Sequence, residues 1–412
     1  MRSETEYDVL IAGAGPGGSS CAMYCARKGH NVLVLDKAHF PRDKTCGDAV
    51  SGKSVRILHD LGLSDHVKKI KHTPIHGVTF SSPKGVVVSI PFKTAPGQAK
   101  GTGYCIRREE FDNFLFSHAK KEKNVTILEG MSVTDLIFEG TRVVGLRARD
   151  EKGKEHEFRA KVVVGADGAQ SVVASKLGLN KVVPAHHCTA ARAYYSGIEG
   201  LTNDIEIHFI KTVMPGYFWI FPLENGMANV GIGMVTEDVQ KRKLNLVQAM
   251  FDAIKNDPLF KERFKNAKLL EGTTKGWTLP FGSHKRKAHG HGFVLLGDAA
   301  SLIDPFSGEG VGNAMTSAKI ASAYIDSAIR KNDFSAGHFA KYENELWAEI
   351  GDELKSSYHL QRIGRIEFLL NLVVDKTAKS KQVRDTISQM LDNREQKTKL
   401  VSPLFYLKLL FA

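Results

Sequence analysis

The stretch DVLIAGAGPGGSS, residues 8–20, decides the fold. Its first five residues form an apolar run bounded by glycine, which is typical of a buried parallel strand. Gly13, Gly15 and Gly18 follow with the spacing G-x-G-x-x-G, and a helical pattern comes next. Glycines so placed let the backbone turn tightly and approach a pyrophosphate, whose charge the free N–H groups of a helix N-terminus attract. The stretch therefore predicts a dinucleotide site; the competing interpretation is a glycine-rich turn without a ligand.

The next segments place this glycine pattern in a strand–helix–strand unit. We expect a helix over residues 19–28 and a second strand over residues 31–36, which ends in Asp36. A carboxylate about 20 residues after such glycines can accept hydrogen bonds from the ribose of an adenosine. A strand, a helix and a second strand ending in an acid make the pattern far more specific than the glycines alone.

Three later segments lead from a strand into a turn that carries a charged or small residue. Residues 104–112 (YCIRREEFD) carry Arg108, and an arginine at a strand end can neutralise a pyrophosphate. Residues 161–168 (KVVVGADG) end in an Asp-Gly turn, and residues 292–300 (GFVLLGDAA) contain Asp298. A second glycine cluster follows before a helical pattern over residues 313–330.

In this order the segments resemble the FAD-dependent oxidoreductases of the para-hydroxybenzoate hydroxylase type. The resemblance implies FAD as cofactor, Asp298 as the ligand of its ribityl chain, and backbone contacts from Gly310 and Val311 to the isoalloxazine. A helix N-terminus there would stabilise the negative charge of reduced flavin. Gly47 and Val133 complete the expected cofactor contacts. Asp167 is expected to shape a turn, and the arginine that often follows this Asp-Gly in the family is absent from residues 171–174 (SVVA).

A narrower resemblance comes from residues 215–222 (PGYFWIFP), followed by GIG at 231–233. They match the Y-x-W-x-F-P and G-x-G pattern of the geranylgeranyl reductase family, and residues 44–48 (KTCGD) look like the Cys-Gly segment that this family places beside the flavin. The resemblance covers roughly residues 7–330. It implies a reductase that saturates C=C bonds of an isoprenoid chain with hydride from reduced flavin.

The residues of these motifs also suggest their chemistry directly. Tyr217, Trp219 and Phe221 alternate, so in a strand they share one face and can line a slot for a long apolar chain; a core-facing aromatic stripe is the alternative. Cys46 is either a reactive thiol beside the flavin or a small residue that fills space. Cys46, Tyr217 or water could donate the proton that accompanies the hydride.

Other function classes remain as alternatives. A monooxygenase or halogenase could use the same fold, and a flavoprotein at a membrane surface could pass electrons to quinone. No second G-x-G-x-x-G marks a dedicated nicotinamide domain, so we expect a transient electron donor such as NADPH or a ferredoxin-like protein. No metal site is expected, because His186-His187-Cys188 lacks a second pair of ligands.

The expected fold class is α/β: a Rossmann-like FAD-binding domain, an antiparallel-sheet substrate domain and a C-terminal helical region. The FAD-binding domain is expected to comprise residues 1–75, 102–182 and 286–335. The substrate domain would take residues 76–101 and 183–285, with a hairpin over 79–91, and the helical region residues 336–412. Apolar runs at 366–374 and 404–412 pack on the body or touch a membrane surface.

Composition limits the compartment and the partners. The chain has 412 residues, 42% of them hydrophobic and 25% charged, as in an ordinary globular protein. Its net charge of +12 is spread along the sequence, so we expect no nucleic-acid partner. Five cysteines suit a reducing compartment. No signal segment and no spanning stretch of about 20 apolar residues is apparent. We therefore expect a cytoplasmic protein, with a peripheral contact to the inner face of the membrane as an option.

Overall fold

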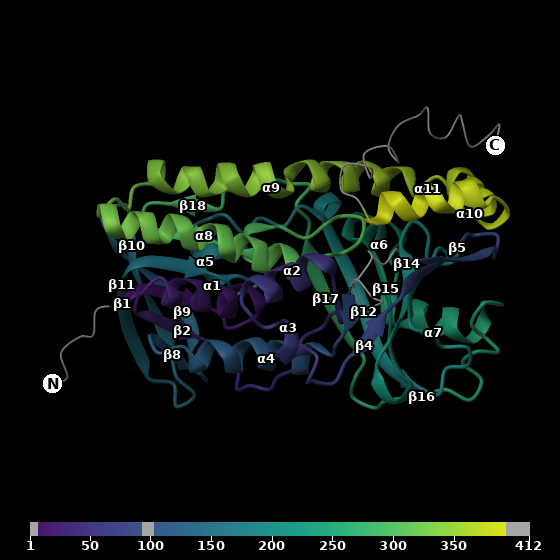
Figure 1. Ribbon diagram of the computed structural model, residues 1–412, viewed down its shortest axis with the longest axis horizontal. Coiled ribbons are helices and arrows are strands. Elements are labelled where there is room, and N and C mark those ends of the chain that lie inside the picture. The colour runs from purple at the N-terminus through teal and green to yellow at the C-terminus, as the bar shows by residue number, and fades with distance from the viewer. Residues whose placement is uncertain (1–6, 93–102, 393–412) are drawn as a thin grey trace.

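The computed structural model describes residues 7–92 and 103–392. They form two eight-stranded sheets and a small three-stranded sheet, with helices packed over them (Figure 1). This confirms the predicted α/β class, with a parallel nucleotide-type sheet, a second and mainly antiparallel sheet, and C-terminal helices. The domain limits stay a prediction, and the apolar run at 404–412 lies outside the described residues.

The first sheet is built around the strand that opens the sequence. β1 pairs in parallel with β11 on one side and β2 on the other, and β8 and β19 extend the parallel set. β9 and β10 form an antiparallel extension on β11. The strands are β1 (Tyr7–Ala12), β2 (Val32–Leu35), β8 (Val125–Leu128), β9 (Ser132–Glu139), β10 (Arg142–Arg149), β11 (Glu155–Gly165), β18 (His289–Gly290) and β19 (Phe293–Leu295). Valine and leucine dominate the central strands because their side chains are buried on both faces of the sheet.

The first helix begins earlier than the sequence pattern suggested. α1 spans Pro16–Arg27, whereas we expected a start at residue 19. Gly15 is its extended N-cap, and Pro16 takes the first helical position, where its missing N–H costs nothing. The glycine–proline pair looks like a turn in the sequence, but it starts the helix. The N-terminal N–H groups of α1 are thereby brought directly beside the glycine turn.

The second sheet is mainly antiparallel and contains the aromatic motif. Its order is β16-β12-β15-β14-β13-β5-β6, with β17 also on β12, and only β13 and β5 pair in parallel. The expected hairpin is present as β5 and β6. The strands are β5 (Gly77–Ser81), β6 (Val87–Pro91), β12 (His187–Ser196), β13 (Asp204–His208), β14 (Tyr217–Pro222), β15 (Met227–Val235), β16 (Lys268–Leu269) and β17 (Lys275–Pro280). The three-stranded sheet consists of β3 (Ala49–Val50), β4 (Thr73–Ile75) and β7 (Gly103–Cys105).

Long C-terminal helices run across both sheets (Figure 1). α8 (Val311–Lys331) packs on α1 and α2, and α9 (Ala336–Ile363) lies along α8 and extends toward the second sheet, where α10 (Glu367–Lys379) and α11 (Lys381–Asp392) contact β6. The remaining helices are α2 (Gly52–Asp60), α3 (Ser64–Val67), α4 (Arg108–Lys121), α5 (Val172–Lys176), α6 (Thr236–Arg242) and α7 (Leu246–Asn256).

The apolar run at 366–374 divides between the core and the surface. Val374 is buried in a cluster with Val78, Val88 and Ile90 of the second sheet. Ile366 and Phe368, in contrast, are 50% and 63% exposed. Within residues 7–92 and 103–392, no helix combines the length and the apolar character that crossing a bilayer requires.

Candidate functional site

A cavity of about 1580 Å³ lies where the two large sheets meet. It exceeds the range of about 300–1,000 Å³ that is usual for a single small molecule, so it has room for a cofactor and a substrate together. All the predicted site residues line this cavity except Gly18: Gly13, Gly15, Asp36, Cys46, Gly47, Arg108, Val133, Tyr217, Trp219, Phe221, Asp298, Gly310 and Val311. Residues separated by almost 300 positions in the sequence thus share one space.

The three motif glycines serve three different purposes. Gly13 has a φ of +95°, and a Cβ atom there would lie 2.5 Å from the carbonyl oxygen of Ala166. A Cβ on Gly18 would collide with the carbonyl oxygen of Gly13, so this glycine lets α1 pack closely on β1. Gly15 is different. A Cβ atom added there would face the cavity and would meet only the Arg42 guanidinium, at 3.7 Å. The open backbone at Gly15 fits a pyrophosphate that approaches the start of α1.

Asp36 at the end of β2 is buried and holds the glycine turn. Its Oδ2 accepts a hydrogen bond from the backbone N–H of Ala14 at 2.7 Å, and its Oδ1 accepts one from Ala38 at 2.9 Å. The carboxylate still lines the cavity, as the ribose prediction requires. Its contact with Ala14 adds a structural purpose that the sequence pattern did not indicate.

The basic side chains of Arg42, Lys44 and Arg108 line the cavity, and the Arg42 guanidinium lies beside Gly15. Arg108 donates two hydrogen bonds to Asp112, at 2.6 and 2.8 Å, and Arg42 donates one to the same carboxylate at 2.8 Å. Burial opposes ionisation of Asp112, but the two guanidinium groups outweigh it and lower its pKa. The Lys44 ammonium lies 3.7 Å from the ring centroid of Trp277, and burial lowers its pKa to about 8.

Arg42 and Lys44 were not singled out in the sequence. Both line the cavity, and together with Arg108 they supply cations suited to a diphosphate. The available signal was the pair of basic residues just before the Cys-Gly segment. Asp167 behaves as expected: it accepts hydrogen bonds from Ser171 and from the backbone of Val172, and so holds the turn that starts α5.

Asp298 lies beside the N-terminus of α8. Gly310 is the N-cap of this helix, and a Cβ on it would lie 3.4 Å from Oδ1 of Asp298. Burial raises the pKa of Asp298, and the positive charges of Lys44, Arg108 and Arg286 act against that rise. A carboxylate and a helix N-terminus therefore face the same part of the cavity.

The three alternating aromatic residues of β14 form one wall of the cavity. The ring centroids of Tyr217 and Trp219 are 6.1 Å apart, and those of Trp219 and Phe221 are 6.2 Å apart. Gly231 pairs with Trp219 across the sheet, and a Cβ there would collide with the indole ring. The missing side chain at Gly231 makes room for the tryptophan ring and also lets the backbone carbonyl of Ala191 approach closely.

The Cys-Gly segment touches this aromatic wall. Cys46 is a free, partly buried cysteine that lines the cavity. A Cβ on Gly47 would lie 2.9 Å from Cε2 of Phe221, so the loop and the wall are in contact. Tyr217 places its hydroxyl 3.5 Å from the carbonyl oxygen of Ser307, and burial raises its pKa, which keeps the phenol protonated.

Comparison with known proteins places this site in a family. Residues 6–331 match the model of an FAD binding domain. The chain is 32% identical to a digeranylgeranylglycerophospholipid reductase of Methanosarcina acetivorans, over 83% of this chain and 81% of the relative. It is also 32% identical to a menaquinone reductase of Mycobacterium tuberculosis, over 79% and 78%.

A solved structure shares the architecture. The geranylgeranyl bacteriochlorophyll reductase-like protein of Thermoplasma acidophilum superposes with a TM-score of 0.81 at 24% identity, covering 96% of this chain and 98% of that one. Together with the matched model and the reductase relatives, this confirms FAD as the cofactor and oxidoreduction as the chemistry. The chain belongs to the geranylgeranyl reductase family of FAD-dependent oxidoreductases.

Proposed function

We propose that this protein saturates C=C bonds in a geranylgeranyl-type isoprenoid chain. The observation that carries the proposal is the contact between the aromatic wall and the Cys-Gly loop, where a Cβ on Gly47 would lie 2.9 Å from Phe221. An apolar chain lying along the wall reaches the loop that this family places beside its flavin. When bound and reduced, FAD supplies the hydride for such a reaction.

The protein's own contribution is to hold the chain and exclude water. Ile205 and Ile207 of β13, and Phe209 just after this strand, continue the lining beside the aromatic residues of β14. Apolar walls on neighbouring strands suit a long hydrocarbon, and a dry cavity prevents loss of the hydride to solvent. This arrangement favours a prenyl chain over a small polar substrate.

We further propose how the chain binds FAD. The Gly15 backbone, Arg42, Lys44 and Arg108 would contact the pyrophosphate, and Asp36 the ribose. Gly47, Val133, Asp298, Gly310 and Val311 would contact the ribityl chain and the isoalloxazine. Support comes from the shared cavity, from the start of α1 at the cavity wall and from the cation cluster. Lys44 is a buried cation that lines the cavity, and because burial lowers its pKa, an anionic group bound nearby would stabilise its charged form.

The proton that completes the saturation has three candidate sources. Cys46 and Tyr217 both line the cavity next to the wall, and water is the third. Because burial raises the pKa of Tyr217, its phenol holds a proton at neutral pH and can release it only to a strongly basic atom. A carbanion-like carbon left by hydride addition is such an atom.

Replacing Asp298 by alanine is expected to weaken FAD binding about 10- to 100-fold, because a partly buried acceptor of a hydrogen bond is removed. Retention of flavin absorbance after extensive dialysis, and a titration of the apoprotein with FAD, measure the effect. Asp298→Asn keeps an acceptor oxygen and should stay within a few-fold of the parent. Full flavin occupancy in Asp298→Ala would remove the ribityl assignment.

The function itself is tested with the reduced holoprotein and a geranylgeranyl glycerophospholipid under anaerobic conditions. Mass spectrometry should show products heavier by two hydrogens for each saturated bond. With oxygen or halide present, a hydroxylated or halogenated product without saturation would favour the monooxygenase or halogenase alternative. Rapid reduction of a quinone ring without prenyl saturation would favour electron transfer to quinone, an alternative that the menaquinone reductase relative makes worth including.

The electron donor and the membrane contact are part of the same proposal. We expect a transient donor such as NADPH or a ferredoxin-like protein. Access to a lipid-borne chain is supported by the exposed pair Ile366 and Phe368, close in sequence to Gln361 and Gly364, which line the cavity. Lipid vesicles should therefore bind the parent protein more tightly than a variant with both exposed residues changed to serine.

A further inference from the structure

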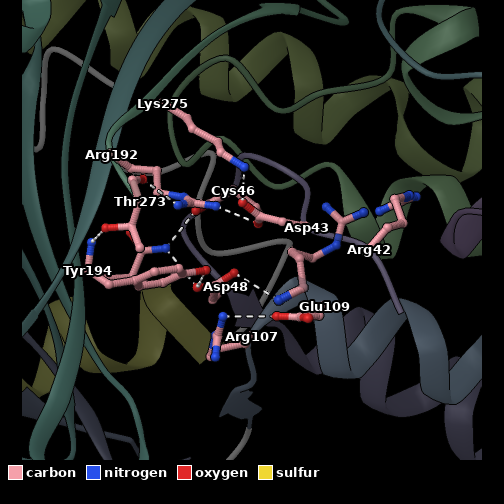
Figure 2. A network of polar contacts seen from close by, with 12 residues as sticks. Arg42, Asp43, Cys46, Asp48, Arg107, Glu109, Arg192, Tyr194, Thr273 and Lys275 are labelled. Atoms are coloured by element: carbon pink, nitrogen blue, oxygen red, sulfur yellow. Dashed lines mark hydrogen bonds and ion pairs between the residues drawn. The ribbon is translucent and has the colours of Figure 1, made fainter. Parts of the chain in front are cut away.

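The loop that contains Cys46 is fastened at its first end by ion pairs. Asp43 Oδ1 lies 2.6 Å from the Arg192 guanidinium, and Oδ2 lies 2.6 Å from the Lys275 ammonium. Arg192 is only 1% exposed and also donates to the carbonyl oxygen of Thr273 at 2.6 Å. Figure 2 shows these contacts between the loop and the second sheet. A buried arginine paired in this way holds the loop firmly.

The other end of the loop is fastened by Asp48, which is 1% exposed. Its carboxylate accepts hydrogen bonds from the Tyr194 hydroxyl at 2.8 Å, from Asn229 Nδ2 at 2.7 Å and from the backbone N–H of Arg108 at 3.0 Å. Asp48 has a φ of +69°, a conformation that aspartate tolerates better than most residues. The arrangement is visible in Figure 2, where Tyr194 and Asp48 point toward one another.

The two attachment points come from one strand. Arg192 and Tyr194 are two positions apart on β12, so their side chains project from the same face of the second sheet. They meet Asp43 and Asp48, five positions apart, on either side of the segment 44–47. The cysteine of the loop thus sits between two fixed points.

Asn229 connects this attachment to the aromatic wall. Its Oδ1 accepts a hydrogen bond from Nε1 of Trp219 at 2.9 Å, and its Nδ2 donates to the carbonyl oxygen of Cys46 at 2.6 Å as well as to Asp48. One buried amide therefore contacts the wall, the cysteine backbone and the carboxylate. A shift of any of the three changes the other two, because a buried network of this kind tolerates no unpaired member.

We propose that Asp48 is a positioning residue, which together with Asn229 fixes the Cys46–Gly47 loop against Trp219, and whose negative charge is required to keep the loop in place. The inference rests on the proposed function in assigning the wall to the substrate chain. If the loop is fixed in this way, the distance between the substrate chain and the face of the flavin is fixed as well. Neither residue needs to touch the reacting atoms.

The charge requirement follows from the partners. All three hydrogen-bond partners of Asp48 donate to it, and the Asn229 Nδ2 and the Arg108 backbone N–H can do nothing else. A proton on the carboxylate would therefore force the Tyr194 hydroxyl to turn from donor to acceptor and would weaken the other two bonds. Burial raises the pKa of Asp48 to about 6, while Asn229 and Tyr194 act in the opposite direction. The other ionisable groups that face it are Arg192 of β12, Arg107 and Arg108 at the start of α4, Cys105 of β7, and Cys46 in its own loop.

A pH titration of the Trp219 environment in the FAD-bound protein tests this directly. With Trp277 and Trp347 changed to phenylalanine, the emission of Trp219 should show a transition centred near pH 6. Tyr194→Phe removes a donor that favours the charged carboxylate, so its transition should move upward by about one pH unit. Asp48→Asn should abolish the transition. Tyr324→Phe is the matched control, because the Tyr324 hydroxyl donates to Glu345 at the surface. The midpoint of the transition in this variant should equal that of the parent protein.

Two results overturn the proposal: an unchanged midpoint in Tyr194→Phe, or a transition that persists in Asp48→Asn. If Asp48→Asn does not fold, Tyr194→Phe alone still decides, since it keeps the carboxylate. In the catalytic assay, Asp48→Asn should lower kcat for prenyl saturation about 10- to 100-fold at nearly unchanged KM and FAD affinity. A parent protein that shows the pH transition but saturates no prenyl chain would refute the proposed function and leave the positioning of the loop intact.

Discussion

Gly15→Ala should fold normally but bind FAD with a dissociation constant about 100-fold higher than that of the parent protein. The backbone at Gly15 is extended, with φ −68° and ψ −172°, a conformation open to any residue. The added methyl group meets only Arg42 at 3.7 Å, so the protein alone accommodates it. The pyrophosphate does not, because the methyl group projects into the space through which the phosphate reaches the start of α1.

Thermal unfolding of the apoprotein and a titration with FAD separate the two effects. Gly17→Ala is the matched control: its new methyl group would meet Ala314 at 3.5 Å, an ordinary contact, so its FAD affinity should stay within a few-fold of the parent's. Gly18→Ala should instead fail to fold well, since its methyl group collides with the Gly13 carbonyl. Parent-like FAD affinity in Gly15→Ala would show that the cofactor approaches elsewhere.

Trp219→Ala should lower kcat/KM for a twenty-carbon prenyl chain about 30-fold more than for a five- or ten-carbon chain, in addition to the loss at every chain length that follows from breaking the contact with Asn229. The indole is 6% exposed overall but lines the cavity, and its loss removes apolar contact worth about 2 kcal/mol from a chain long enough to reach it. Steady-state kinetics with a series of chain lengths measure the difference. Equal losses for all lengths would contradict a slot lined by this wall.

A conservative variant separates the wall from the polar network. Trp219→Phe keeps an aromatic ring on the wall but loses the donor to Asn229. In this variant, kcat/KM should still depend on chain length much as in the parent protein. The flavin absorbance spectrum and the pH transition should change, because the Cys46–Gly47 loop loses a contact that holds it. Trp219→Ala should show both defects, so the pair distinguishes apolar contact from positioning.

What the sequence could predict was local in origin. The glycine turn, β1, β2 and the alternation in β14 depend on neighbours within a few residues, and the structure contains each of them. Asp298 was singled out through the family resemblance, which rests on a contiguous pattern, a strand that ends in Gly-Asp before a glycine cluster. Its contact with the ribityl chain stays a prediction. Even the error at the start of α1 was local, since it came from interpreting Pro16 as part of a turn.

The parts of the site that sequence reasoning missed depend on long-range contacts. Asp48 meets Tyr194 across 146 positions and Asn229 across 181. Nothing in the neighbourhood of Tyr194 marks its hydroxyl as a partner of a distant carboxylate. Arg42 was missed for a related reason: its value comes from lying beside Gly15, and its guanidinium is held there by Asp112, 70 positions away in the sequence.

The cavity described above has a consequence for how the protein matures. Its lining begins at Gly13, just after the first strand, and ends at Gly364, just after the longest helix of the described residues. The complete cavity therefore forms only after the chain has been synthesised at least as far as Gly364, so full enclosure of the flavin waits until α9 is in place.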